Sequence, residues 1–311
     1  MAVPEIFRGK LKLPVLGAPM FIVSQPELVT AQCRAGIVGS FPTLNARKLE
    51  DLESWLQQFT AVSKESGAAP FGANLIVHKS NSRLAADTDL VIKYRVPYVI
   101  TSVGDPTDVV RRVHEYGGIV FHDVINLRHA KKAMSCGVDG LILVCAGAGG
   151  HGGTLSPFAF VPEVRSIFSG AISLAGAIST GAHVRAAIAM GADLASMGTR
   201  FIATKEAKAS DAYKQMIVDS GSADILYTPY FSGVNANFLR GSVEAGGFEP
   251  ADVMGKRESA SLAEDLSHAE DGGPKAWKDI WSAGQGVGAI YDVPPVADLV
   301  TRLKAEYDAA P

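Results

Sequence analysis

The chain has 311 residues, of which 47% are hydrophobic and 20% are charged, so it is long enough to bury a large core in one or two domains. Its 29 basic and 32 acidic residues give a formal net charge of -3 and form no basic stripe, which argues against a nucleic-acid partner. No run of about 18 apolar residues predicts a membrane span. The first residues lack the pattern of a signal peptide, and we expect a cytoplasmic protein. Three cysteines without CxxC spacing give no indication of a zinc site.

The first part of the chain alternates apolar runs with helical segments. The run 13–20 ends in Ala18-Pro19-Met20, and the segment 24–27 that follows has the form of a capping box opening a helix. The next apolar run covers 37–41, after which Asn45 is placed to cap an amphipathic helix with six apolar residues on one face between 49 and 62.

The same alternation continues to residue 201. Further strands are predicted at 71–77, 98–103, 119–124, 140–145, 171–176 and 193–201. The helices between them are predicted near 83–95, 105–116, 127–136, 162–168 and 181–190. Several of these helices are followed by a glycine, the residue that the left-handed turn after a helix favours.

Eight strands that are apolar throughout indicate a parallel sheet covered on both faces. Because eight strands close a barrel, we predict an α/β fold of the TIM (β/α)8 type. An open doubly wound sheet is the alternative, but no GxGxxG turn follows the first strand. We assign 1–204 and 284–311 to the barrel, and 205–283 to a small, mostly helical subdomain that covers the active site. Within that subdomain, the polar stretches that begin at 255 and 264 are expected to form an exposed loop.

Ligands of such barrels bind at the carboxyl ends of the strands, which fixes the candidate positions. The loops 176–181 and 198–199 place glycines and hydroxyls before helices and are suited to a phosphate, although plain turns would look similar. Asn74 interrupts an apolar strand, where its amide would bind a heteroaromatic ligand or a neighbouring loop. His122 and Asp123 are adjacent in a strand, so at most one of them faces the site.

The segment 146–153 holds one ionisable side chain, His151, among five glycines, directly after a buried apolar run. Small residues at a strand end leave room for a bulky ligand, and His151 is the titratable group beside it. A loop histidine bonded to the backbone is the alternative interpretation.

Five motifs together resemble the nitronate monooxygenase family, also called 2-nitropropane dioxygenases. They are Gly17-Ala-Pro-Met20, Asn74, the Ala-Gly-Gly-His-Gly stretch at 148–152, Met197-Gly-Thr-Arg-Phe201 and Ala283-Gly-Gln-Gly286. The similarity runs in matching order from about residue 10 to the last helix. The family consists of FMN-dependent TIM barrels and includes enoyl-ACP reductases and NADH:quinone reductases.

The resemblance implies that FMN binds with its phosphate on the loops after the seventh and eighth strands. The implied cofactor-binding residues are Ala18, Pro19, Met20, Asn74, Asp123, Ala148, Gly149, Gly150, Gly176, Ala177, Gly198, Thr199 and Gln285. His151 matches the family histidine that lies over the flavin and acts as base or orients the substrate. The implied reaction converts an alkyl nitronate with O2 to a carbonyl compound and nitrite. The implied partners are O2 and a small-molecule substrate, a nitronate or other small carbon acid.

This sequence also departs from the family pattern. The loop at 175–181 lacks the usual acidic residue, Gly147 replaces a polar residue, and Asp123 stands where several relatives carry lysine. The alternative function is an FMN-dependent NAD(P)H reductase of an enone or quinone. A flavin-free sugar-phosphate isomerase would place more acidic or lysine residues at the strand ends, and a non-enzymatic binding module would not need so many vacated strand ends. A homodimer is compatible with the sequence.

Overall fold

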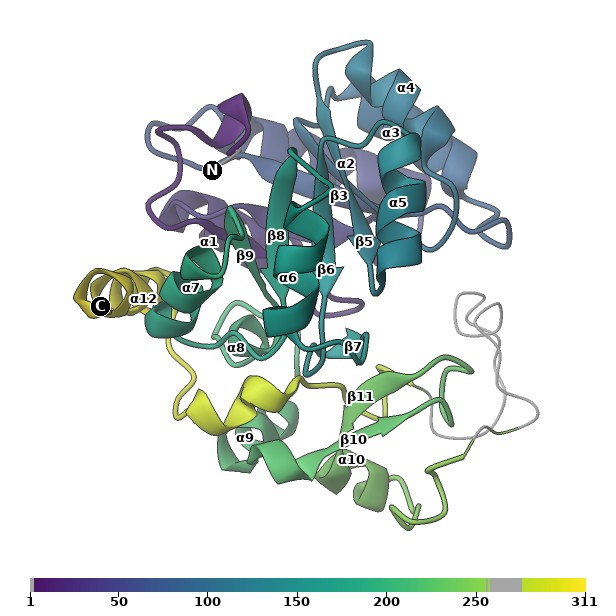
Figure 1. Cartoon of the computed structure of the whole chain (residues 1–311), viewed down its shortest axis with the longest axis vertical. Helices are drawn as coiled ribbons and strands as arrows, with labels where there is room; N and C mark the ends of the chain where they lie inside the picture. Colours follow the sequence, from purple (N-terminus) through teal and green to yellow (C-terminus); the bar gives the residue numbers. More distant parts are fainter. Residues whose placement is uncertain (1–2, 256, 258–275) are drawn as a thin grey trace.

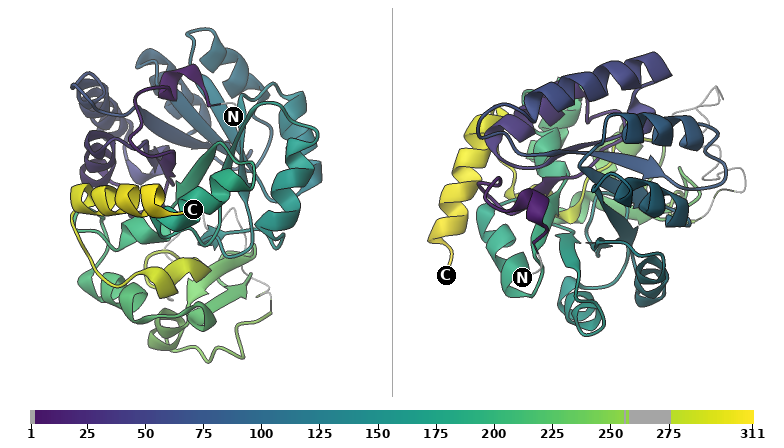
Figure 2. Two further views of the ribbon diagram at one scale, coloured as in Figure 1. Left: turned by 60° about the vertical axis from the view of Figure 1, so that its left-hand side comes forward. Right: turned by 90° about the horizontal axis from the view of Figure 1, so that it is seen from above.

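The computed structural model describes residues 3–255, 257 and 276–311. Eight parallel strands form a barrel inside a ring of helices (Figures 1 and 2), as the sequence predicted. The strands are β1 (Val15–Gly17), β2 (Gly39–Pro42), β3 (Phe71–Ile76), β4 (Tyr98–Ser102), β5 (Ile119–Val124), β6 (Gly140–Val144), β8 (Ala171–Ala175) and β9 (Leu194–Met197). Their order is β1-β9-β8-β6-β5-β4-β3-β2, and a parallel bridge between Leu16 and Val38 joins the two end strands and closes the barrel.

Helices follow the strands in the alternation expected for this fold. They are α1 (Pro26–Ala35), α2 (Leu49–Val62), α3 (Leu84–Lys93), α4 (Thr107–His114), α5 (Leu127–Ser135), α6 (Pro157–Arg165), α7 (Gly181–Ala189), the short α8 (Thr199–Ile202) and the C-terminal α12 (Val296–Ala309). Short 3-10 turns lie at η1 (Glu5–Phe7), η2 (Thr43–Asn45), η3 (Ser222–Asp224) and η4 (Gln285–Ala289). Helix α12 packs against α7 and α1 (Figure 2) and so brings the end of the chain back to the ring. Among the residues described, no helix is both long and apolar enough to cross a membrane.

The barrel interior is closed at its amino-terminal end by aromatic side chains. Phe7 contacts the Tyr98 ring edge-on at 5.4 Å, and Tyr98 contacts Phe121 in the same way at 5.2 Å. Two glycines leave space for these rings, since a Cβ atom on Gly72 would lie 2.4 Å from Tyr98 and one on Gly140 would lie 2.3 Å from Phe121. The filled end leaves the opposite, carboxyl end of the barrel as the place for a ligand.

The segment after the barrel strands contains a small sheet that the sequence did not predict. Helices α9 (Asp211–Asp219) and α10 (Arg240–Ala245) agree with the helical description of 205–283. Strands β10 (Ile225–Thr228) and β11 (Ala236–Leu239) do not, and they form an antiparallel sheet with β7 (Gly150–His151) next to the carboxyl end of the barrel (Figure 1). The strands are only four residues long, and β11 finds its second partner more than 80 residues away, so no local pattern marks them. The loop expected from 255 onward lies largely outside the described residues.

Four local predictions need correction. The strand predicted at 193–201 ends at Met197, and Thr199–Ile202 form the short helix α8 instead. Helix α6 begins at Pro157, five residues before the predicted start, with Pro162 inside it. Helix α1 has Gln25 at its N-cap without a side-chain cap, because the Ser24 hydroxyl instead accepts a hydrogen bond from the Met20 amide. Helix α2 begins after Lys48, so Asn45 does not cap it.

Candidate active site

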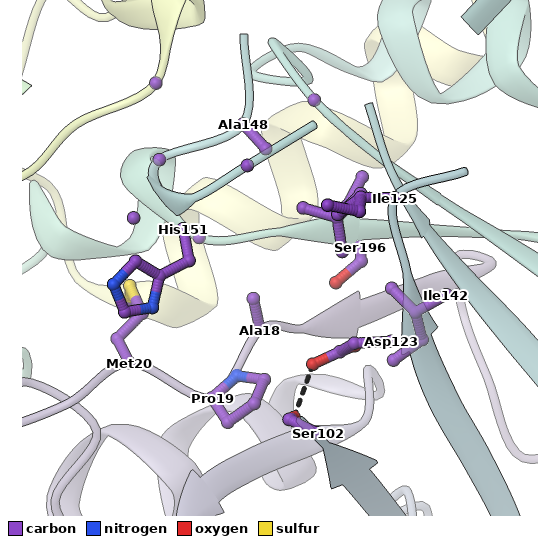
Figure 3. Close-up of a pocket in the computed structure, with 18 of the residues that line it drawn as sticks. Ala18, Pro19, Met20, Ser102, Asp123, Ile125, Ile142, Ala148, His151 and Ser196 are labelled. Carbon is purple, nitrogen blue, oxygen red and sulfur yellow. Dashed lines mark hydrogen bonds between the residues drawn. The ribbon is translucent and has the colours of Figure 1, made fainter. Parts of the chain in front are cut away.

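A cavity of about 950 Å³ lies at the carboxyl end of the barrel, close to the upper end of the usual range for ligand pockets. Its walls come from the carboxyl ends of all eight barrel strands, from most of the loops that follow them, and from the added segment 205–283, including Tyr213, Val234, Asn235 and Trp277. Figure 3 shows side chains from the loop after β1, from β4, β5, β6, β7 and β9, and from the loop before β7 arranged around this space. The sequence pattern predicts a ligand site at this end of the barrel, but it predicts no site residue in the added segment.

One side of the cavity is formed by the loop after β1. Ala18, Pro19 and Met20 line the cavity there. Asn45 fixes this loop from behind, because its side-chain amide donates to the Met20 carbonyl at 3.0 Å and to the Ser24 carbonyl at 2.9 Å. Its side-chain oxygen accepts from the amide of Ile22 at 2.8 Å. Asn45 therefore positions a cavity wall.

A chain of polar side chains crosses the floor of the cavity. The Asn74 amide donates to the Ser102 hydroxyl at 2.8 Å, and Ser102 donates to Asp123 at 2.5 Å (Figure 3). Burial raises the pKa of Asp123 to about 6, and the hydrogen bond from Ser102 offsets part of that effect. Asn74 also donates to the Ile100 carbonyl, while its oxygen accepts no bond from any residue of the described ranges. That oxygen is available to a ligand.

His151 lies at the rim of the cavity, on the short strand β7. Its Nε2 lies 3.0 Å from the hydroxyl of Ser232, which also bonds the Val234 carbonyl at 2.9 Å. A carbonyl only accepts, so the Ser232 hydrogen goes to Val234 and the serine oxygen accepts from His151 Nε2–H. This network assigns the Nε2–H tautomer and leaves the lone pair on Nδ1.

The surroundings of His151 keep its ring neutral and fixed. Burial lowers the pKa of His151 to about 4. The Trp277 ring meets the imidazole edge-on, with ring centroids 5.2 Å apart. His151 is therefore a held, uncharged hydrogen-bond acceptor facing a ligand cavity. Its alternative interpretation as a backbone-bonded loop histidine does not fit this geometry.

The loops after β8 and β9 form the opposite side of the cavity. Gly176 has φ +137° and Ala177 has φ +53°, so the chain turns sharply there and presents its backbone to the cavity. Ser179 follows two residues before α7, and its buried hydroxyl has no hydrogen-bond partner among the described residues. After β9, the Thr199 hydroxyl accepts from the Gly284 amide at 2.9 Å and keeps its own hydrogen free to donate.

Twelve of the thirteen implied cofactor-binding residues line the cavity, and His151 lines it with them. The exception is Gln285, whose side chain lies beside Gly147, where an added Cβ would come within 3.0 Å of it. Its neighbours Gly284 and Gly286 do line the cavity. Ser102, near the end of the strand predicted at 98–103, joins the floor. Ser232 and Trp277 were missed, because nothing in the local pattern of the added segment connects them to His151.

His122 and Asp123 face opposite sides of the barrel wall, as the alternation in a strand requires. Asp123 bonds Ser102 at the cavity floor. The His122 Nδ1 lies 2.8 Å from the Thr101 hydroxyl on the outer side. Both nevertheless line the cavity, because it extends over the end of β5.

Comparisons with known proteins agree with this geometry. The model of the family described as "Nitronate monooxygenase" matches residues 6–306. A nitronate monooxygenase of Paraburkholderia phytofirmans is 26% identical over 94% of this chain and 92% of its own length. A Mycobacterium tuberculosis enzyme named as an octahydro-indene-carboxyl-CoA dehydrogenase is 26% identical over 82% of this chain and 68% of its own.

Among solved structures, FabK from Thermotoga maritima superposes with a TM-score of 0.78 at 26% identity, covering 96% of this chain and 94% of that one. The family match spans nearly the whole chain, and its members are enzymes. The chain belongs to the nitronate monooxygenase family of flavin-dependent oxidoreductases.

Proposed function

We propose that this protein is an FMN-dependent nitronate monooxygenase, which oxidises alkyl nitronates with O2 to carbonyl compounds and nitrite. The observation that carries the proposal is a neutral histidine with a free ring nitrogen, placed across a cavity from loops suited to a phosphate. The family membership and the cavity size support it.

The residues present fit FMN. Ser179 offers a buried, unpartnered hydroxyl just before α7, on the side of the helix where the dipole favours a phosphate. The Gly181 and His183 amides of that end are already bonded to Glu306 and Thr180, so the contribution of α7 is its dipole and the Ser179 hydroxyl. Gly176, Ala177, Gly198 and Thr199 would complete the phosphate site. The ring would be held by Ala18, Pro19, Met20, Asn74 and Asp123 on one side, and by Ala148, Gly149 and Gly150 on the other, with Gln285 supporting the loop at Gly147. Bound FMN supplies an electron acceptor for the nitronate and a route for electrons to oxygen.

The remaining steps belong to the protein. With Nε2–H tied to Ser232, His151 presents only the Nδ1 lone pair to the cavity. This form suits a general base that takes a proton from the carbon of a neutral nitro compound and so generates the nitronate in place. The apolar walls, Met20 and Ile142 among them, exclude water from that step.

We expect the purified protein to be yellow, to consume O2 with propionate 3-nitronate or propyl-2-nitronate, and to release nitrite. The His151→Ala variant should lose about 100-fold or more of kcat/KM with the neutral nitroalkane, which is the usual contribution of a general base. An unchanged flavin spectrum in the variant would separate lost catalysis from lost cofactor. A yellow protein that oxidises no nitronate contradicts the proposed reaction.

The second candidate is an FMN-dependent NAD(P)H reductase of an enone or quinone. The likeness to FabK over 96% of the chain favours it. Rapid anaerobic bleaching of the flavin absorbance by NADH or NADPH is the expected outcome for this candidate and not for the first.

A further inference from the structure

The cavity that holds His151 also extends to the outer side of the barrel wall, between β5 and α5. We call this extension the α5 lobe, and define it by Val103, His122, Ile125, Arg128, His129 and Lys132. It is a part of the same cavity, not a separate hollow. A ligand with its reactive end at His151 could therefore reach it without leaving the protein.

The α5 lobe carries positive charges that lack partners. Arg128 and Lys132 are four residues apart on α5 and so share one face. Within the described ranges neither forms a salt bridge, whereas Arg111 on neighbouring α4 pairs with Asp108 and Glu115. Helix α5 itself contains no acidic residue.

One carboxylate, that of Asp105, interacts with Lys132, one of these cations, but it already accepts two hydrogen bonds from Thr107. Asp105 accepts the Thr107 amide at 3.0 Å and the Thr107 hydroxyl at 2.5 Å. These bonds hold the pKa of Asp105 below its ordinary value, with a smaller contribution from Lys132. Asp105 therefore leaves the α5 lobe with a surplus of positive charge.

Arg128 and Lys132 are both exposed, and only Arg128 lies where the helix dipole disfavours a cation, since Lys132 is in the last turn of α5. The first turn of a helix favours acidic side chains, because its free amides carry partial positive charge. The first turn of α5 has no acidic residue and carries Arg128. An anion at this point would interact favourably with both the side chains and the helix end.

The α5 lobe also has apolar side chains in its lining, Val103 and Ile125. Val103 is 39% exposed and Ile125 is 37% exposed. Val103 also has φ +56°, an uncommon conformation for a β-branched residue. Apolar side chains beside two cations in one lining suit a ligand with an uncharged middle and an anionic end.

We propose that the α5 lobe binds the nucleotide phosphates of a second, elongated ligand whose reactive end lies at His151. The proposal rests on the flavin site proposed above, which would occupy the chamber between the β1 loop and the β8 and β9 loops. The phosphates could belong to a coenzyme A thioester or to a reduced nicotinamide dinucleotide. Both have the same chemistry at this end, and the experiment distinguishes them.

The test uses the flavin-loaded protein with coenzyme A and NADPH as separate probes, measured by calorimetry. We expect at least one probe to bind. The Arg128→Gln/Lys132→Gln variant should weaken that binding about tenfold or more, because it removes two charge-assisted contacts. Lys131→Gln is the matched control, since Lys131 is an exposed lysine of the same helix outside the α5 lobe, and it should change the dissociation constant less than about twofold.

Salt gives a second measurement. Raising NaCl from about 50 mM to about 300 mM should weaken the wild-type complex more than that of the double variant. If the double variant weakens the binding of NADPH alone, the α5 lobe is a reductant site. If it weakens the binding of coenzyme A alone, the α5 lobe is a thioester site. Equal affinities of wild type and double variant, or binding of neither probe, overturn the proposal. A colourless protein would instead contradict the flavin proposal, so the two failures are distinguishable.

Discussion

At the scale of single residues, Ser232 determines which nitrogen of the His151 ring carries the proton. Its hydrogen is given to the Val234 carbonyl, so its oxygen can only accept from His151 Nε2–H. A positioning residue of this kind does not touch the substrate. It acts by keeping the Nδ1 lone pair directed into the cavity.

The variant Ser232→Ala should therefore disturb the tautomer more than the fold. We expect kcat for a neutral nitroalkane to fall about tenfold with KM nearly unchanged, since a misaligned base loses part of its usual contribution. Ser232→Thr keeps the hydroxyl and should restore most of the rate. In ¹⁵N NMR of histidine-labelled protein, wild type should show the Nε2–H tautomer for His151 and Ser232→Ala a mixture. An unchanged tautomer in Ser232→Ala would refute this role.

Asp123 makes a second residue-scale prediction, through the pH dependence of stability. Burial raises its pKa from 3.8 to about 6, so the folded state favours the protonated acid. That contribution is fully present below pH 4 and is lost as pH rises from about 4 to about 6. Above pH 6 the ionised Asp123 carboxylate lowers the free energy of unfolding by on the order of 1–3 kcal/mol. The range allows for screening by solvent, because the side chain is partly exposed.

Asp123→Asn should thus raise the unfolding free energy of the flavin-free protein at pH 7.5 and change it little at pH 4, as measured by urea unfolding. Asp105→Asn is a control of opposite sign. The pKa of Asp105 is lowered by Thr107, so its contribution exists above pH 3.8 and is lost in acid. A stabilisation by Asp123→Asn that does not depend on pH would contradict the assignment.

At the scale of elements, the strands were predictable and the roles of their connecting residues were not. Apolar runs located all eight barrel strands because a parallel strand covered on both faces excludes polar side chains. Asn45 shows where local patterns fail. Its spacing before a helix predicted a cap, yet it bonds Met20, Ile22 and Ser24, more than 20 residues earlier. A side-chain amide satisfies either role equally well, and only the packed structure decides between them.

The residues of the candidate site likewise fall into a group that the sequence predicted and a group that it did not. The strand-end residues were predictable because their place follows from the barrel itself. Ser232 and Trp277 were not, because they reach His151 from positions 81 and 126 residues later in the chain. Their contribution depends on how the added segment folds back on the barrel, which no periodicity records.

At the scale of the whole molecule, the added segment holds the loop that carries His151. Strand β11 pairs with β7, and the Asn237 side chain donates to the Ala148 carbonyl at 2.6 Å. Ser282 accepts from the Gly150 amide and donates to the Asn237 carbonyl, both at 2.7 Å. The barrel and the added segment thus meet at the residues that line the cavity. The active-site loop depends on long-range contacts for its position.

Asn237→Ala tests this dependence, because it leaves the buried Ala148 carbonyl without its side-chain donor, at a cost of about 1–3 kcal/mol. We expect kcat/KM with a nitronate to fall about tenfold and flavin to dissociate faster in fluorescence measurements, since Ala148 and His151 share the released loop. Ser220→Ala removes a hydroxyl that bonds Met216 in the same added segment but away from the loop, and it should leave both quantities unchanged. If Asn237→Ala lowers stability but keeps the full kcat/KM and flavin retention expected of Ser220→Ala, the barrel alone positions His151 and the added segment serves only as a cover.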